Sequence, residues 1–239
     1  MQSSGERAQS RATAQDARTR GRSGGRRDCI LGLASLLPAL LLSHFAMAAG
    51  QPPATLLVVG DSLSAEYGIA RGSGWVALLE QKLAEAGRKV TVVNASISGD
   101  TTAGGRARLA ALLEQHRPSH VLIELGGNDA LRGLPLAGTE ANLAAMVKAA
   151  RAARAQVGLI GMQVPPNYGA AYGRDFANLF AKVAKAEGAA LVPFLLAGVA
   201  DGPEAERSFQ PDRIHPLASA HPRMLANVWP VVAGWFRLR

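Results

Sequence analysis

Short runs of apolar, β-prone residues recur five times along the chain, at 55–59, 90–93, 121–125, 157–160 and 190–194. Continuous apolar runs of this length are typical of strands that are buried on both faces. Between the runs, apolar residues fall three or four positions apart, over 75–86, 102–115, 140–153, 171–187 and 217–235. This spacing predicts helices that turn one apolar side toward a core.

Strands that alternate with helices predict a parallel sheet with helices on both of its faces. With five strands in a chain of 239 residues, we expect a three-layer α/β/α, flavodoxin-like fold. In such folds the functional site lies at the carboxyl ends of the strands. We find no internal repeat and expect a single domain over 49–239.

The first 48 residues have a different character. Residues 1–28 are rich in Arg, Ser, Gly and Ala and lack apolar periodicity, which predicts a disordered basic leader. A Leu-rich uncharged segment at 30–42 and the small residues of Ala46-Met47-Ala48 then predict a signal peptide that is cleaved near Ala48, with export to the periplasm. The alternative is a retained membrane anchor, because 29–49 carries no charge.

Composition narrows the function classes. Half of the formal net charge of +8 lies in residues 1–28, and the rest is dispersed among acidic residues. No basic stripe with interleaved aromatic residues is present, so we expect no nucleic-acid partner. The single cysteine, Cys29, lies in the leader, which excludes a disulfide or a cysteine nucleophile in the mature chain.

The first apolar run ends in Gly60-Asp61-Ser62-Leu63-Ser64, which predicts that Ser62 lies on the turn that leaves the first strand. A serine in that position can face a substrate with its backbone N–H beside it, in a region that favours negative charge. The alternative is that Asp61, Ser62 and Ser64 only cap a helix.

The second and third runs also end in small polar residues. Gly99 has no Cβ and can bring its N–H close to a substrate oxygen, although a tight turn with Asp100 or Thr101 as helix cap is an alternative. Gly126-Gly127-Asn128-Asp129 places a carboxamide at the same edge, although these residues are also common in turns. Backbone N–H groups and an Asn side chain are the donors that a tetrahedral oxyanion needs.

A candidate base follows the fifth run, in Asp212-Arg213-Ile214-His215-Pro216. A carboxylate three residues before a histidine can fix its tautomer and stabilise the imidazolium. Pro216 suits the first residue of a following helix. A surface salt bridge or half of a metal site are the alternatives, but His116, His120 and His221 supply no third ligand in a metal-binding pattern. We therefore expect those three histidines to be structural, and neither a metal nor a cofactor to be needed.

Together, these four segments resemble the blocks of the GDSL or SGNH hydrolase family. The similarity runs from about Thr55 to the C-terminus. It implies a serine hydrolase with Ser62 as nucleophile, His215 as base and then acid, and Asp212 as the group that orients His215. It further implies an oxyanion hole formed by the N–H groups of Ser62 and Gly99 with the Asn128 side chain.

The segments 93–101, 124–129 and 166–169 resemble more narrowly the bacterial periplasmic subfamily described as acyl-CoA thioesterase, lysophospholipase and arylesterase in one. This resemblance implies activity on small acyl esters and thioesters. We further expect a monomer that contacts membrane lipid transiently. It also implies a mobile loop at 162–168 beside the acyl group. The side chains expected to contact substrate are Asp61, Asp129, Pro165, Pro166, Asn167 and Tyr168.

Two other functions remain open from the sequence. Relatives with the same fold include esterases that deacetylate carbohydrates, and these would use the same triad. A non-catalytic flavodoxin-like binding module would retain the turns only as caps, and it would have no reason to place Asp212 and His215 beside the serine turn.

Overall fold

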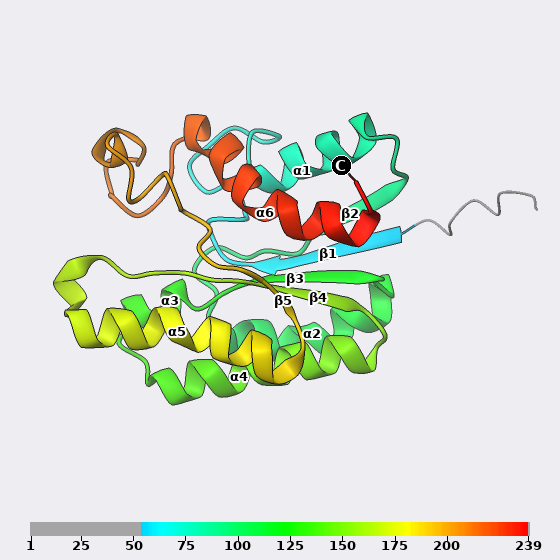
Figure 1. The fold of residues 1–239 in the computed structure, drawn as a ribbon, viewed down its shortest axis with the longest axis horizontal. Helices are drawn as coiled ribbons and strands as arrows, with labels where there is room; N and C mark the ends of the chain where they lie inside the picture. Colours follow the sequence, from blue (N-terminus) through cyan, green and yellow to red (C-terminus); the bar gives the residue numbers. More distant parts are fainter. Residues whose placement is uncertain (1–53, 239) are drawn as a thin grey trace, which may run out of the picture. The chain divides into compact units, whose positions relative to one another are not determined.

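The structure is a computed structural model and describes residues 54–238 (Figure 1). The predicted leader, signal peptide and cleavage site at 1–48, including Cys29, lie outside the described residues. Five parallel strands form one sheet in the order β2-β1-β3-β4-β5, which confirms the expected flavodoxin-like α/β fold. The strands are β1 (Ala54–Gly60), β2 (Val90–Asn94), β3 (His120–Glu124), β4 (Gln156–Ile160) and β5 (Ala190–Val192).

Helices cover the two faces of the sheet (Figure 1). On one face α1 (Trp75–Glu85) packs against α6 (His221–Phe236). On the other face α4 (Leu136–Ala152) packs between α2 (Thr102–His116) and α5 (Ala170–Glu187). Short 3-10 turns complete the connections, at η1 (Pro166–Tyr168), η2 (Ala205–Arg207) and η3 (Ala218–Ala220).

The central strands are almost completely buried, which explains their uninterrupted apolar runs. All five residues of β3 are buried, and β1 is buried from Leu56 to Gly60. The edge strand β2 is only partly buried. Burial of β1 and β3 on both faces anchors their carboxyl ends, so the loops that follow Gly60 and Glu124 leave from a rigid support.

Three boundaries differ from the expected ones. Helix α4 begins at Leu136 and includes Gly138, because that glycine is exposed and breaks no packing. The closing helix begins at His221, since Pro216 instead forms an isolated bridge with Phe209. The turn expected after β3 is a short helix, α3 (Gly127–Leu131). Within 54–238, none of the helices combines the length and apolar character needed to cross a membrane.

Candidate active site

The structure joins Ser62, His215 and Asp212 in one hydrogen-bonded chain. The Oγ atom of Ser62 lies 2.9 Å from Nε2 of His215, and Nδ1 of His215 lies 2.7 Å from Oδ2 of Asp212. Ser62 follows β1, whereas the other two residues lie on a loop more than a hundred residues later, before α6. This is the arrangement in which an imidazole can remove a proton from a hydroxyl while a carboxylate holds its tautomer.

A tight turn fixes the carboxylate of Asp212. Its Oδ1 accepts the backbone N–H groups of Ile214 (2.9 Å) and His215 (3.0 Å), so the loop wraps around the carboxylate. Arg213 adopts a left-handed conformation (φ 59°) to close this turn. The hydrogen bonds from the His215 backbone and side chain and from the Ile214 backbone lower the pKa of Asp212 to about 2. Asp212 is therefore ionised throughout the neutral range.

Two residues that the sequence does not single out support His215. The ring of Tyr67 lies against the imidazole, with centroids 4.2 Å apart. The side chain of Gln210 donates to the carbonyl of Tyr67 (2.9 Å) and to that of Pro216 (3.2 Å), and its backbone N–H donates to the carbonyl of His215 (2.8 Å). Gln210 thus ties the loop of His215 to the turn of Ser62. No local motif marks either residue, because each contact joins distant parts of the chain.

The turn that carries Ser62 is held by Asp61. Oδ1 of Asp61 accepts the N–H of Leu63 (3.0 Å), and its backbone carbonyl accepts the N–H of Ala65 (3.0 Å). Helix α1 begins only at Trp75 and has no side-chain cap. The polar residues of this turn therefore do not cap α1, and Ser62 stays half-buried with its hydroxyl toward His215.

Gly99 lies on the loop after β2 in a left-handed conformation (φ 78°), which favours glycine. Arg132 holds its carbonyl with a 2.7 Å hydrogen bond. The next residues belong to α2, where Thr101 caps the helix by accepting the N–H of Gly104, as the alternative interpretation expected. The capping of α2 by Thr101 and the left-handed conformation of Gly99 are therefore compatible.

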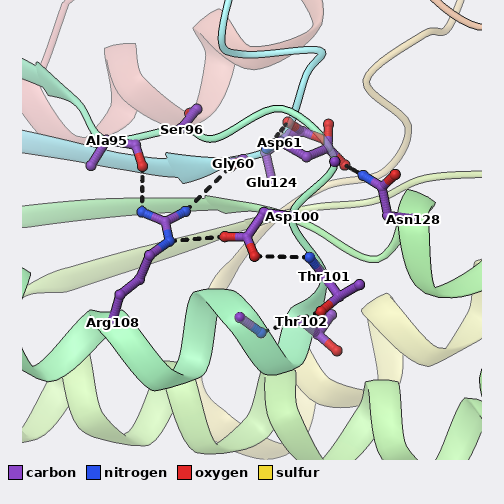
Figure 2. A network of polar contacts seen from close by, with 12 residues as sticks. Gly60, Asp61, Ala95, Ser96, Asp100, Thr101, Thr102, Arg108, Glu124 and Asn128 are labelled. Carbon is purple, nitrogen blue, oxygen red and sulfur yellow. Dashed lines mark hydrogen bonds and ion pairs between the residues drawn. The ribbon is translucent and has the colours of Figure 1, made fainter.

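Arg108 clamps this loop to the end of β1 (Figure 2). Its guanidinium donates to Asp100 Oδ2 (2.8 Å), to the carbonyl of Ala95 and, more weakly, to the carbonyl of Gly60 (3.4 Å). One planar side chain thereby spans the segments that carry Ser62 and Gly99. Its position eight residues after Asp100 on α2 gives no sequence signal for this role.

Asn128 lies on α3, and its Nδ2 donates to Oδ2 of Asp61 at 3.1 Å (Figure 2). This bond uses one amide hydrogen and orients the carboxamide, so the other hydrogen is available to a substrate oxygen. Burial raises the pKa of Asp61 to about 6, against the opposing hydrogen bonds from Leu63 and Asn128. Asp61 therefore carries its charge at neutral pH and loses it under mildly acidic conditions.

Both acidic residues expected at the substrate lie in the interior. Asp61 and Asp129 are each 2% exposed. Asp129 accepts the backbone N–H of Thr102 (2.8 Å) and the hydroxyls of Thr102 and Thr139. These bonds tie α3 to the starts of α2 and α4 and give Asp129 a structural role. Contact of either residue with substrate stays a prediction.

The loop expected to border the acyl group follows β4. Pro165, Pro166 and Asn167 are exposed, and the half-buried ring of Tyr168 lies 6.2 Å from that of Tyr172. Within 54–238, none of the hydrogen bonds links this loop to Ser62 or His215. Its contact with substrate likewise stays a prediction.

The other histidines occupy structural positions. His221 starts α6, is 3% exposed and accepts the N–H of Trp75 on Nδ1 at 3.0 Å. His120 starts β3 and packs against the rings of Trp235 and Phe236. His116 ends α2, where Arg117 adopts the left-handed cap conformation.

Exposed large apolar side chains lie on segments that adjoin the proposed site residues in sequence. Tyr67 follows Ser62, Ile97 precedes Gly99, and the other side chains flank Asn128 or His215. The full set among the described residues is Tyr67, Ile97, Leu131, Leu134, Ile214 and Leu217. Exposed apolar clusters commonly mark binding surfaces. We refer to these six residues as the apolar rim.

Comparison with known proteins places this geometry in a family. Residues 58–223 match the model of the GDSL-like lipase/acylhydrolase family. The chain is 53% identical over 178 residues to Esterase TesA of Pseudomonas aeruginosa, covering 74% of this chain and 87% of that protein. It is 44% identical over 183 residues to Thioesterase 1/protease 1/lysophospholipase L1 of Escherichia coli, covering 77% of this chain and 84% of that protein.

A solved structure agrees with these matches. The crystal structure of TesA superposes with a TM-score of 0.71 at 54% identity, covering 74% of this chain and 96% of that one. The matched range 58–223 contains Ser62, Gly99, Asn128, Asp212 and His215. The chain belongs to the GDSL-like lipase/acylhydrolase family and is a hydrolase of this class.

Proposed function

We propose that this protein cleaves carboxylic esters and thioesters through an acyl-enzyme formed on Ser62. The observation that carries the proposal is the chain of hydrogen bonds from Asp212 through His215 to the Ser62 hydroxyl. A helix cap or a binding module has no need for this chain, whereas acyl transfer depends on it.

The reaction follows from the positions of these atoms. Nε2 of His215 takes the proton of Ser62 as Oγ attacks the acyl carbonyl, and the carbonyl oxygen becomes an oxyanion. The N–H groups of Ser62 and Gly99 and the Nδ2 of Asn128 stabilise that oxyanion. His215 then gives its proton to the departing alcohol or thiol. Water then attacks the acyl-enzyme while His215 accepts its proton. His215 returns this proton to Oγ of Ser62 as the carboxylic acid is released.

The apolar rim supports acyl and aryl substrates. Ile97 and Leu131 flank two of the proposed oxyanion donors, and Ile214 precedes His215, so an acyl chain held at Ser62 has apolar surface on several sides. Esterase, thioesterase and lysophospholipase appear in the names of the relatives, which supports the same range of substrates. Pro165, Pro166, Asn167 and Tyr168 would border the acyl group from the loop after β4.

The setting of the reaction is part of the proposal. The basic leader followed by an apolar segment and Ala46-Met47-Ala48 supports export and cleavage near Ala48. The protein would then act in the periplasm as a monomer and meet membrane lipid only transiently through its substrates.

Replacement of the nucleophile tests the proposal directly. In Ser62→Ala we expect kcat for p-nitrophenyl butyrate to fall by at least about 10⁴-fold, because the attacking oxygen is lost. The thermal midpoint should stay near that of the wild type, since Ser62 is half-buried and its removal leaves no large cavity. The matched control is Ser219→Ala, an exposed serine before α6, which should keep full activity. Wild-type activity in Ser62→Ala would refute the assignment.

A substrate panel tests the acyl preference. We expect hydrolysis of p-nitrophenyl esters with medium acyl chains, of acyl-CoA and of lysophospholipid, because the apolar rim stabilises bound acyl chains. Strict preference for p-nitrophenyl acetate would contradict this part and favour a carbohydrate O-acetyl esterase.

A further inference from the structure

A buried carboxyl group lies directly beneath the turn that carries Ser62, and the reaction described above does not use it. It belongs to Glu124, the last residue of β3, which is 1% exposed and pairs in register with Gly60 at the end of β1 (Figure 2). Burying a carboxyl group is costly unless the group is neutralised or hydrogen-bonded. The contacts that Glu124 makes at the base of the turn must therefore offset the cost of burying it.

One oxygen of Glu124 holds both ends of the serine turn. Oε2 accepts the hydroxyl of Ser64 at 2.7 Å and the backbone N–H of Asp61 at 3.3 Å. These two donors lie on either side of Ser62 in the sequence. The rigid strand β3 thus fixes the turn from below, while His215 contacts the Ser62 hydroxyl.

The absence of a side chain at Gly60 makes this contact possible. A Cβ at Gly60 would lie 2.8 Å from Oε2 of Glu124 and 2.7 Å from Oγ of Ser64, closer than real Cβ contacts. The glycine before Asp61 and Ser62 is therefore required by the carboxyl group beneath it. Gly60 in the serine turn and Glu124 at the end of β3 therefore depend on each other for space.

No basic side chain neutralises Glu124 among the described residues. Asp61 faces it from the serine turn, and the nearby guanidinium of Arg108 on α2 donates to Gly60, Ala95 and Asp100 instead. Oε1 is buried and makes no hydrogen bond within 54–238. Burial, and then the charge of Asp61, raise the pKa of Glu124 well above its usual range. A shift in this direction favours the neutral acid, which needs no partner cation.

We propose that Glu124 is a positioning residue of the hydrolase: it holds Asp61 and Ser64 so that Ser62 faces His215 and the Asp61 carboxylate orients Asn128. This inference rests on the proposed function, because positioning has meaning only if Ser62 is the nucleophile. Glu124 acts through hydrogen bonds to its neighbours and does not touch the reacting atoms.

The test compares two substitutions at Glu124 in the full chain. Glu124→Gln keeps an uncharged oxygen acceptor of the same size, and we expect kcat to stay within about threefold of the wild type. Glu124→Leu fills the space but releases the turn, and kcat should fall about 100-fold with little change in KM, as expected for a misplaced nucleophile. Rescue by Gln and loss by Leu together identify positioning by a neutral acceptor.

Two further variants keep the test decisive. Ser64→Ala removes one of the two bonds and should lower kcat by about tenfold, even if Glu124→Leu fails to fold. His120→Asn alters a buried polar residue at the opposite end of β3, and it should lower stability without changing kcat. Wild-type kcat in Ser64→Ala, or equal loss in Glu124→Gln and Glu124→Leu, would overturn the proposal.

The rate of covalent labelling by a fluorophosphonate separates this proposal from the one on which it rests. Labelling reports the reactivity of the serine without any choice of ester substrate. Ser62→Ala should not be labelled, and labelling of that variant would refute the nucleophile assignment. If Ser62 is labelled at the wild-type rate in both Glu124→Leu and Ser64→Ala, only the role of Glu124 fails.

Discussion

The loop around His215 and the helix α6 that follows it use the same residue types for opposite purposes. In the loop, both nitrogens of His215 bond to side chains, Ser62 and Asp212, and the imidazole is partly exposed. In α6, His221 is almost fully buried, and its Nδ1 accepts the backbone N–H of Trp75 at the start of α1. The first histidine can exchange a proton with a substrate, whereas the second joins two helices.

Two asparagines repeat this contrast. Asn227 on α6 donates its Nδ2 hydrogens to the carbonyls of Leu195 and Ala197, both at 2.8 Å. Asn128 donates to a single acceptor, Asp61, and keeps one hydrogen. For the asparagines, an oriented carboxamide is available for chemistry when one of its hydrogens has no acceptor within the protein.

Replacing each histidine by asparagine is the most severe test of this division of roles. In His215→Asn we expect kcat for p-nitrophenyl butyrate to fall on the order of 10⁴-fold or more, because no base remains to accept the Ser62 proton. In His221→Asn we expect kcat within about twofold and a lower thermal midpoint, because a buried contact between α1 and α6 is weakened. Steady-state kinetics and thermal unfolding measure both. Equal loss of kcat in the two variants would contradict the division of roles.

Replacing the two asparagines tests the same division of roles with smaller effects on kcat. Asn128→Ala should lower kcat by about 10²–10³-fold with little change in KM, because it removes a donor that acts on the oxyanion of the transition state. Asn227→Ala should lower the thermal midpoint and leave kcat unchanged, because its bonds hold only the segment after β5. If kcat of Asn128→Ala matched the wild type, Asn128 would be no part of the oxyanion hole.

The elements that follow from local patterns were predictable from the sequence. Buried strands such as β1 and β3 are uninterrupted apolar runs, and their polar ends mark where the chain leaves the sheet. The alternation of strands and helices also predicts the parallel sheet, because a parallel connection needs a crossover helix. Ser62 and His215 could be named because each lies in a short recognisable segment at such an end.

The supports of the site were not predictable in the same way. Glu124 appears as one more residue of an apolar strand, and Arg108 as an ordinary charge on α2. Gln210 precedes the His215 turn without any motif. Each acts through contacts across distant segments, and tertiary packing decides such contacts. The sequence also did not predict helix α3, because Gly126 and Gly127 favour a turn when only local propensity is considered.

We expect a smaller effect of His221 on how the thermal stability of the protein depends on pH. Burial lowers the pKa of His221, so the folded protein binds its proton less readily than the unfolded chain does. A lowered folded-state pKa gives stability that is present above the unfolded value near 6.5 and is lost as pH falls below it. Relative to wild type, His221→Asn should therefore lose less thermal stability between pH 7 and pH 5.

The comparison between variant and wild type isolates this contribution from those of the neighbouring groups. Glu66 faces His221 and opposes the shift, and Asp61 near the triad changes stability in the opposite sense, because burial raises its pKa. Asp61 is the same in the two proteins, so its contribution cancels in the difference between the two pH profiles, which reports His221 together with its interaction with Glu66. Calorimetry at several pH values measures that difference. Parallel profiles would show that His221 does not titrate differently on folding, and the contrast between the two histidines would then rest on catalysis alone.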